Sequence, residues 1–213
     1  MDLAEYSVRR FADTVASEAP APGGGSVAAL EGSLGAALTA MVACLTQGRK
    51  KYAAYAENAA LVQEKAEGLQ RRLLSLMEED SRAFLLVSEA FSLPRETEEQ
   101  KALRSAAIQE GLRACTQTPM EMMRLCDEAI SLCSDFLEEG FNQSSASDLG
   151  VAFLSLRSAM ESAWLNVLIN LSSIKDPVFV KTYRENGEAL LNRALPLAEK
   201  GYQKILSLIR DEP

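Results

Sequence analysis

The chain has 213 residues, of which 47% are hydrophobic, and a formal net charge of −8. This length predicts a single domain, residues 1–213, with a sizeable core. The acidic balance argues against nonspecific binding to nucleic acid or to an anionic membrane surface. The sequence contains no histidine, which excludes Ser-His triads and most zinc sites. Acid–base chemistry must therefore use carboxylates, Lys, Tyr or Cys.

No uninterrupted apolar run is long enough to span a membrane, and the first residues lack the basic region of a signal peptide. We therefore expect a cytoplasmic protein. The four cysteines form no C-x-x-C pair and fall within helical patterns, so we expect reduced thiols in the core. These cysteines are Cys44, Cys115, Cys126 and Cys133.

The first helical pattern covers residues 3–18 and runs into a turn rich in proline and glycine. The turn reads Pro20-Ala21-Pro22-Gly23-Gly24-Gly25-Ser26. Glycine permits backbone angles that a Cβ forbids, and Ser26 is a strong N-cap candidate, so we expect a helix over residues 26–47. The free N–H groups of such a helix start suit an anionic or carbonyl ligand. The alternative is a tight turn that only brings two helices together.

Small residues recur through residues 27–40, which predicts close packing against another helix, within the chain or across a dimer. Gly48 ends this helix, and Arg49, Lys50 and Lys51 follow as a basic cluster. These three residues either form a solvated helix end, where cations are favourable, or anchor a carboxylate or phosphate.

The longest pattern predicts a helix over residues 56–92 with a core-facing stripe in steps of three and four. The stripe consists of Val62, Ala66, Leu69, Leu73, Leu76, Asp80, Ala83, Val87 and Ala90. An unpaired carboxylate in an apolar stripe is costly, so the pKa of Asp80 should rise or Asp80 should recruit a cation. Asp80 is therefore either a polar residue that fixes helix register or a catalytic carboxylate tuned towards neutral pH.

The next helix opens at a capping box that begins with Thr97 and runs to Glu139. Pro119 should kink or break it near residues 116–118. A polar loop over residues 141–148 follows, and Ser147 or Asp148 can cap a helix that ends near residue 174.

That helix carries a polar stripe, which suits either recognition of a polar heterocycle or hydrogen bonding between helices. The stripe consists of Ser155, Ser158, Ser162, Asn166 and Asn170. The last helix begins at Asp176-Pro177 and runs to about residue 211, with a bend expected near Gly187 or Pro196. No strand signal occurs. The sequence therefore predicts an all-α bundle of five to six long, mostly antiparallel helices.

Several segments together resemble the cyclodeaminase/cyclohydrolase family, over nearly the whole chain. They are Pro20-Ala21-Pro22-Gly23-Gly24-Gly25-Ser26-Val27-Ala28-Ala29-Leu30, Gly48-Arg49-Lys50-Lys51-Tyr52, Glu79-Asp80-Ser81-Arg82-Ala83-Phe84, Asn142-Gln143-Ser144-Ser145-Ala146-Ser147-Asp148 and Asn166-Val167-Leu168-Ile169-Asn170. The first segment is a motif specific to this family. In the family pattern Gly and Asn are adjacent, whereas Phe141 separates Gly140 from Asn142 here.

The resemblance implies a helical homodimer with a cleft at or near the subunit interface, a tetrahydrofolate substrate, and no metal or redox cofactor. The implied reaction converts 5-formiminotetrahydrofolate to 5,10-methenyltetrahydrofolate with release of ammonia. Two alternatives are a 5,10-methenyltetrahydrofolate cyclohydrolase and a non-catalytic helical module that binds folate or a partner.

In this setting we expect Asp80 and Lys50 to be catalytic, with Asp80 transferring the proton. The basic cluster would hold the glutamate tail of the folate, and the Asn166/Asn170 pair would recognise the pterin edge. The expected substrate-binding residues are Pro22, Gly23, Gly24, Gly25, Ser26, Arg49, Lys51, Asn142, Asp148, Asn166 and Asn170.

Overall fold

A computed structural model describes residues 3–210, and within that range every regular element is a helix. The α-helices are α1 Val8–Val15, α2 Gly24–Gln47, α3 Ala56–Phe91, α4 Glu98–Glu139, α5 Ala146–Leu171 and α6 Pro177–Arg210. Short 3₁₀ helices cover Leu3–Glu5, Lys50–Tyr55 and Gln143–Ser145. The expected all-α bundle is confirmed.

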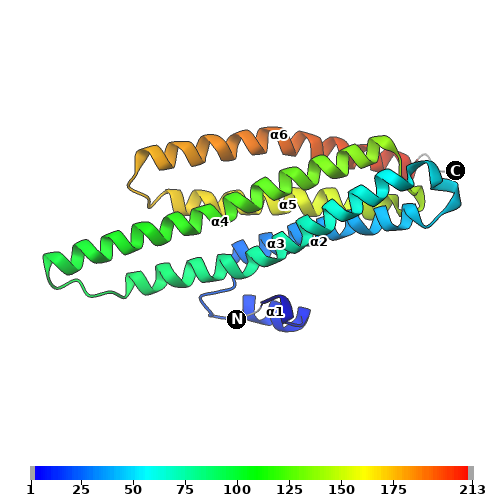
Figure 1. Ribbon diagram of the computed structural model, residues 1–213. Helices are drawn as coiled ribbons and strands as arrows, with labels where there is room; N and C mark the ends of the chain where they lie inside the picture. The colour runs from blue at the N-terminus through cyan, green and yellow to red at the C-terminus, as the bar shows by residue number, and fades with distance from the viewer. Residues whose placement is uncertain (1–2, 211–213) are drawn as a thin grey trace.

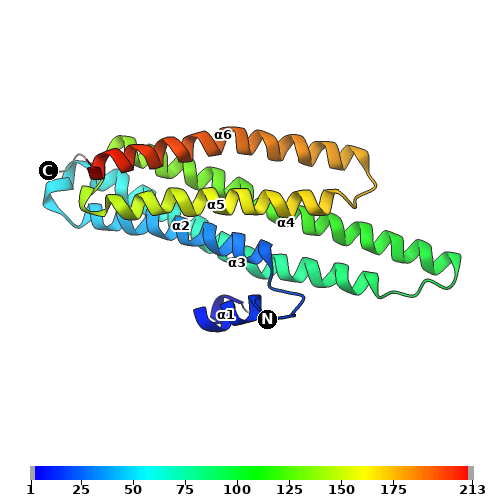
Figure 2. The ribbon, with the colours of Figure 1, turned by 180° about the vertical axis from the view of Figure 1, so that it is seen from behind.

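Helices α2 to α6 lie alongside one another as an elongated bundle, whereas α1 lies beside it (Figures 1 and 2). Helix α2 packs against α3 and α5, and α4 packs against α3, α5 and α6. The α2–α3 and α4–α5 connections lie together at one end of the bundle, which we call the loop end (Figure 1). In the opposite direction the α3–α4 hairpin projects past the start of α2, so α2 begins beside the middle of the bundle.

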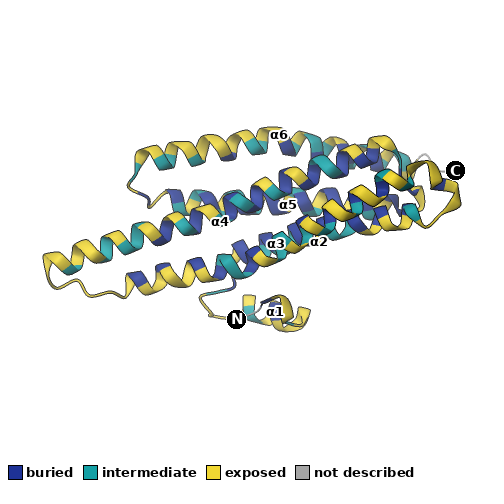
Figure 3. Cartoon of the chain, in the orientation of Figure 1, coloured by how far each residue is buried: buried dark blue, intermediate teal, exposed yellow. Residues whose placement is uncertain are grey.

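The core runs along the shared axis of these helices, and exposed residues dominate the projecting α3–α4 tip (Figure 3). Every apolar member of the α3 stripe is buried, which confirms that it faces the core. Asp80 is half-buried in the same stripe. Thr97 and Gln100 form the expected capping box at the start of α4.

Helix α2 is long and apolar enough to cross a membrane by length and composition alone, and 56% of its apolar window is buried inside the bundle. Its small residues allow the close approach that the sequence predicts. A Cβ on Gly35 would lie 2.7 Å from Leu156 on α5, and a Cβ on Gly32 would lie 3.2 Å from Cys126 on α4. Close packing within the chain therefore accounts for much of the composition of α2.

Several expected helix boundaries are wrong. Residues 3–18 are not one helix, because a 3₁₀ turn precedes α1 and the Ser7 hydroxyl caps α1 separately. Pro119 lies inside an unbroken α4. Helix α5 follows Ser145 without a side-chain cap, so Ser147 and Asp148 lie in its first turn, and it ends at Leu171.

At the start of α6, Asp176 caps the helix as expected by accepting from the backbone N–H groups of Val178 and Phe179 at 3.0 and 3.2 Å. Helix α6 continues unbroken past Gly187 and Pro196. Its expected end at residue 211 lies outside the described residues.

Candidate functional site

The first turn of α2 meets α3 at Asp80. The Ser26 hydroxyl lies 3.0 Å from Asp80 Oδ2, 3.1 Å from the Met77 carbonyl and 3.1 Å from the Ser81 hydroxyl. The backbone N–H of Ser26 also hydrogen-bonds the Asp80 carboxylate. Asp80 thus supplies from α3 the acceptor that an N-cap residue normally provides. Ser26 as N-cap is wrong: the N-cap is Gly23, which has no side chain, and the Ser26 hydroxyl faces α3.

One glycine of the turn serves close approach, and none of the three serves an unusual backbone angle. Among the described residues Gly140 alone has a positive φ, so none of the three turn glycines needs one. A Cβ on Gly25 would lie 2.1 Å from Asp80 Oδ1, which no packed structure tolerates. A Cβ on Gly24 would make an ordinary contact with Asn166 at 3.5 Å, and one on Gly23 would meet nothing within 4 Å. Gly25 is therefore the position that lets the carboxylate reach the helix.

The surroundings of Asp80 raise the pKa of its carboxyl group above the ordinary value of 3.8. Burial is the largest cause, because it disfavours the charged form, and the two hydrogen bonds from Ser26 partly offset it. No charged side chain among the described residues contributes to this shift. Asp80 can therefore hold a proton at a higher pH than an ordinary aspartate, as a proton-transfer group requires.

Helix α5 brings Asn166 and Asn170 to the same region, both half-buried. Asn166 lies against Gly24, and Asn170 donates from Nδ2 to the Cys115 carbonyl of α4 at 2.9 Å. Cys115 in turn is close enough to Asp80 for the carboxylate to raise the pKa of the thiol, which burial and this charge together place at about 11. Four helices, α2, α3, α4 and α5, thus meet at this site.

The remainder of the polar stripe lies away from Asp80. Ser158 is exposed and donates to Glu31 of α2 at 2.9 Å, which is the helix-to-helix alternative. Ser155 and Ser162 are half-buried. Only the end of the stripe that contains Asn166 and Asn170 belongs to the Asp80 site.

The basic cluster lies at the loop end, far from Asp80 in the same chain. Arg49, Lys50 and Lys51 are exposed and follow the C-terminal end of α2, whereas Asp80 contacts its N-terminal end. Helix α2 has 24 residues, which at about 1.5 Å per residue separates its two ends by roughly 35 Å. Within a single chain Lys50 and Asp80 therefore lie too far apart to act on the same reacting atoms.

Asn142 is also at the loop end, where its polar groups are used by the fold. Its backbone N–H donates to Thr46 Oγ1 at 2.9 Å, its Nδ2 donates to the Leu45 carbonyl at 3.3 Å, and its Oδ1 accepts from the Ser144 N–H at 3.2 Å. The residue is 2% exposed, so within this chain Asn142 leaves its polar groups bound to the fold and buried. Phe141 packs in the core against Phe136, with ring centroids 6.1 Å apart. Asp148 lies at the same end, half-buried.

Pro22 is buried and Gly23 is exposed at the entrance to α2. The structure therefore brings together Gly24, Gly25, Ser26, Asp80, Asn166 and Asn170, with Pro22 and Gly23 leading into them. Sequence reasoning missed Ser81 and Cys115. Ser81 could have been found because it directly follows Asp80. Cys115 could have been found because it lies four residues before Pro119.

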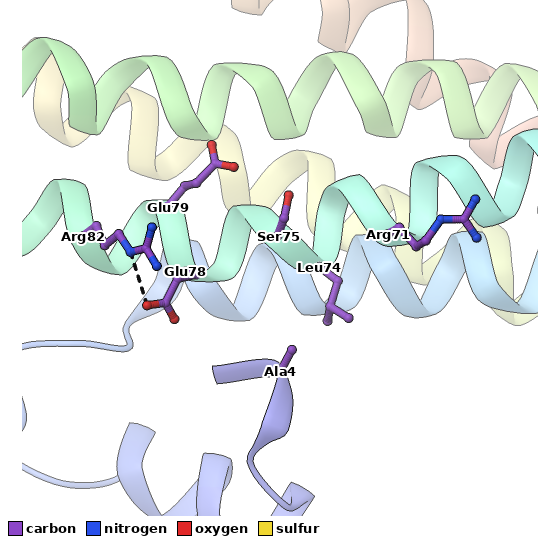
Figure 4. A pocket seen from close by; sticks show the side chains of 7 residues that line it. All are labelled: Ala4, Arg71, Leu74, Ser75, Glu78, Glu79 and Arg82. Atoms are coloured by element: carbon purple, nitrogen blue, oxygen red, sulfur yellow. Dashed lines mark ion pairs between the residues drawn. The ribbon is translucent and has the colours of Figure 1, made fainter. Parts of the chain in front are cut away.

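A pocket of about 600 Å³ lies elsewhere, between α3 and the segment that precedes α1 (Figure 4). Two charged residues of its lining, Arg82 and Glu78, pair with each other at 3.3 Å, whereas Glu79 pairs with Arg72, which lies outside the lining. None of the expected site residues lines it.

Three cysteines are buried as expected, but Cys44 is exposed, so its placement in the core is wrong. Burial raises the pKa of Cys126 and Cys133 to about 12. Among residues 3–210 no group of three His, Cys, Asp or Glu side chains could hold a metal ion.

Known proteins resemble this chain along its length. The sequence profile of the formiminotransferase-cyclodeaminase family matches residues 7–189. A methenyltetrahydrofolate cyclohydrolase from Methylorubrum extorquens is 41% identical over 203 residues, which is 95% of this chain and 97% of that protein. The formimidoyltransferase-cyclodeaminase of Rattus norvegicus is 35% identical over 192 residues; these cover 90% of this chain and 35% of the rat protein.

The fold has a solved counterpart. The crystal structure of a formiminotetrahydrofolate cyclodeaminase from Thermotoga maritima superimposes with a TM-score of 0.79 and 27% identity, and the match covers 98% of both chains. The profile, the relatives and the shared fold agree, and the chain belongs to the formiminotransferase-cyclodeaminase family.

Proposed function

We propose that this chain is a folate one-carbon enzyme that converts 5-formiminotetrahydrofolate to 5,10-methenyltetrahydrofolate and releases ammonia. The observation that supports this most directly is the Asp80 carboxyl group, which is held by Ser26 and is half-buried, with no cation from residues 3–210 beside it. A single carboxyl group with a raised pKa can both give and accept a proton near neutral pH. The family relatives named above include a stand-alone cyclodeaminase of the same fold.

The chemistry needs two proton movements. N10 of the folate attacks the formimino carbon to form a new C–N bond and loses its proton, and the original bond to the formimino nitrogen breaks. The formimino group enters as its cationic amidinium, whose nitrogen already carries two hydrogens, and one further proton lets that nitrogen leave as ammonia. Asp80 donates a proton to the departing nitrogen, and its carboxylate receives the proton from N10. Such proton transfer typically contributes about 10²–10⁴-fold to the rate.

A second candidate is hydrolysis of 5,10-methenyltetrahydrofolate, which the 41% identical cyclohydrolase favours. Here the Asp80 carboxylate would accept a proton from the attacking water, and the proton would then pass to the nitrogen whose bond to the former methenyl carbon breaks. Both reactions use the Asp80 carboxyl group and the same folate framework. They differ in the nucleophile, which is N10 of the folate in the deaminase and water in the hydrolase.

We also propose that the enzyme acts as a homodimer through the outward faces of α2 and α5. These faces expose large apolar side chains, on α2 from Leu34 onwards and on α5 from its first turns to its last: Leu34, Met41, Leu45, Val151, Leu154, Leu165 and Ile169. Leu165 and Ile169 are 67% and 68% exposed and lie within one turn of Asn166. An apolar surface of this extent is typical of a protein interface.

A second copy of the chain suits this face. A two-fold axis across it would place the N-terminal end of α2 in one copy beside the C-terminal end of α2 in the other. The partner's basic cluster would then lie near Asp80, where the described residues of the same chain supply no cation. The two carboxylates of a folate glutamate are suitable ligands for Arg and Lys. A self-complementary interface of this kind is usual in C₂ dimers.

The activity is tested by following the absorbance of the methenyl product, once with the formimino substrate and once with the methenyl substrate. Formation of the chromophore from the first substrate supports the deaminase, and its loss from the second above the uncatalysed rate supports the hydrolase. The Asp80→Asn variant controls for trace contaminants in both assays. A folded parent protein that binds tetrahydrofolate but changes neither substrate would leave only the non-catalytic alternative.

A further inference from the structure

A proline inside a helix leaves one carbonyl without its usual donor. Helix α4 continues through Pro119, which has no N–H, so the Cys115 carbonyl four residues earlier lacks its helical hydrogen bond. The amide nitrogen of Asn170 on α5 donates to this carbonyl at 2.9 Å. A side chain of the candidate site therefore occupies the place of the missing backbone donor.

This contact sets the direction of the Asn170 amide. The same Nδ2 donates to the Asn166 carbonyl at 2.8 Å. Both partners are carbonyl oxygens, which can only accept, so the nitrogen must face them and Oδ1 must point away. No described residue donates to that oxygen, and no described side-chain nitrogen or oxygen is both buried and unpaired. Asn170 Oδ1 is therefore an acceptor open to its surroundings.

Asn166 repeats the arrangement one turn earlier on α5. Its Nδ2 donates to the Ser162 carbonyl at 2.9 Å, which likewise leaves Oδ1 as the group available to a ligand. The asparagine pair thus presents two acceptors on one helix face, beside the first turn of α2.

We propose that Pro119 is a positioning residue: by freeing the Cys115 carbonyl, it fixes the Asn170 amide with its oxygen towards the substrate. The substrate edge recognised there carries N–H donors, as the ring N–H and exocyclic amine of a pterin do. This proposal rests on the proposed folate function for the identity of the ligand, but the orientation of the amide does not.

The Pro119→Ala variant restores an N–H that competes for the Cys115 carbonyl and so releases the Asn170 side chain. Pro196→Ala is the matched control, because Pro196 lies inside α6, is exposed and is four residues after exposed Asn192. We expect Pro119→Ala to melt at the same or a higher temperature than the parent, since alanine suits a helix interior better. Its KM should rise roughly tenfold, as for one lost hydrogen bond, with kcat within about twofold. Pro196→Ala should leave both constants unchanged.

A double-mutant comparison separates positioning from a general packing effect. If Pro119 acts through Asn170, Pro119→Ala should cause no further rise in KM when Asn170→Ala is already present. An equal rise in both backgrounds, or unchanged kinetics in Pro119→Ala alone, would overturn the proposal.

A second readout does not depend on activity. In nitrogen-15 NMR spectra the Asn170 side-chain protons should exchange slowly in the parent and in Pro196→Ala, and faster in Pro119→Ala. If the parent lacks folate activity but this difference appears, the proposed function fails and the positioning role stands. Equal exchange in all three proteins would refute the role of Pro119 whatever the activity.

Discussion

At the scale of single residues, the feature that matters most is a carboxyl group shared between two tasks. Asp80 closes the first turn of α2 through Ser26 and is also the proposed proton carrier. A neutral amide of the same shape can still accept a hydrogen bond but cannot titrate. The two tasks can therefore be separated by one substitution.

In the Asp80→Asn variant we expect kcat to fall about 10²-fold or more, while the melting temperature stays at or above that of the parent. Asp127→Asn is a suitable control, because Asp127 is another buried carboxylate but is bound by Arg193, with Nε 2.7 Å from Oδ1. It should lower the melting temperature and preserve kcat. Single-turnover formation of the methenyl product and thermal unfolding measure both effects. Turnover of Asp80→Asn within a few-fold of the parent would refute the catalytic role.

The raised pKa of Asp80 also predicts how stability depends on pH. The folded chain binds this proton more tightly than the unfolded chain. The contribution of Asp80 to the free energy of unfolding is therefore complete below pH 3.8 and is lost as pH rises through the higher pKa of the folded state. Relative to Asp80→Asn, the parent should therefore become steadily less stable as pH rises from 3.8 towards neutrality. Urea unfolding of both proteins across this range gives the difference in free energy. A difference that does not change with pH would contradict the raised pKa.

At the scale of elements, the start of α2 is defined by how near its backbone comes to α3. Gly25 carries this approach, because any Cβ there would overlap the Asp80 carboxylate. Not every helical glycine has such a role. Gly68 on α3 is exposed and has open space where a Cβ would stand.

Gly25→Ala should therefore lower the free energy of unfolding by about 1–3 kcal/mol and abolish turnover, since the carboxylate must move away from Ser26. Gly68→Ala should raise it by about 0.5–1 kcal/mol with activity unchanged, because alanine costs less entropy in a helix. Chemical denaturation and the methenyl assay on both variants make the comparison. An active, unperturbed Gly25→Ala protein would show that the close approach is unnecessary.

Local sequence patterns predicted the elements well and their meeting points less well. The stripe from Val62 to Ala90 fixed both the face of α3 and the unusual position of Asp80, because its spacing is set by the helix itself. Ser26 was misread as a cap, since capping preference considers only neighbours in sequence, whereas the real acceptor lies on α3. The direction of the Asn170 amide was equally hidden, because it depends on a carbonyl freed by Pro119 on another helix.

At the scale of the whole molecule, the bundle separates two groups of expected site residues. Lys50 and Asp80 both belong to segments that resemble the family, yet the length of α2 holds them apart. Sequence alone could not show this, because a motif gives residue types and not the distance between the ends of a helix. The proposed dimer reunites the two groups across its two-fold axis.

Mixing two inactive variants tests this arrangement. Asp80→Asn and Lys50→Ala, each impaired alone, should regain about a quarter of the parental activity after joint unfolding and refolding, because half of the dimers then contain one intact site. Sedimentation of each protein shows whether dimers form at all. If the mixture is no more active than its components, or if the protein sediments as a monomer, Lys50 does not act in a partner's site.

The cap that Asp80 gives to α2 also sets an order of events in folding. Ser26 and Asp80 are 54 positions apart in the chain, so the first turn of α2 receives its acceptor only after α3 has been synthesised and has docked. Contacts between distant residues form later than local helical ones because they must first overcome the entropy of closing the loop. The last part of α2 to become ordered is then the part that completes the site. A partly folded chain would have most of its helices and none of its activity.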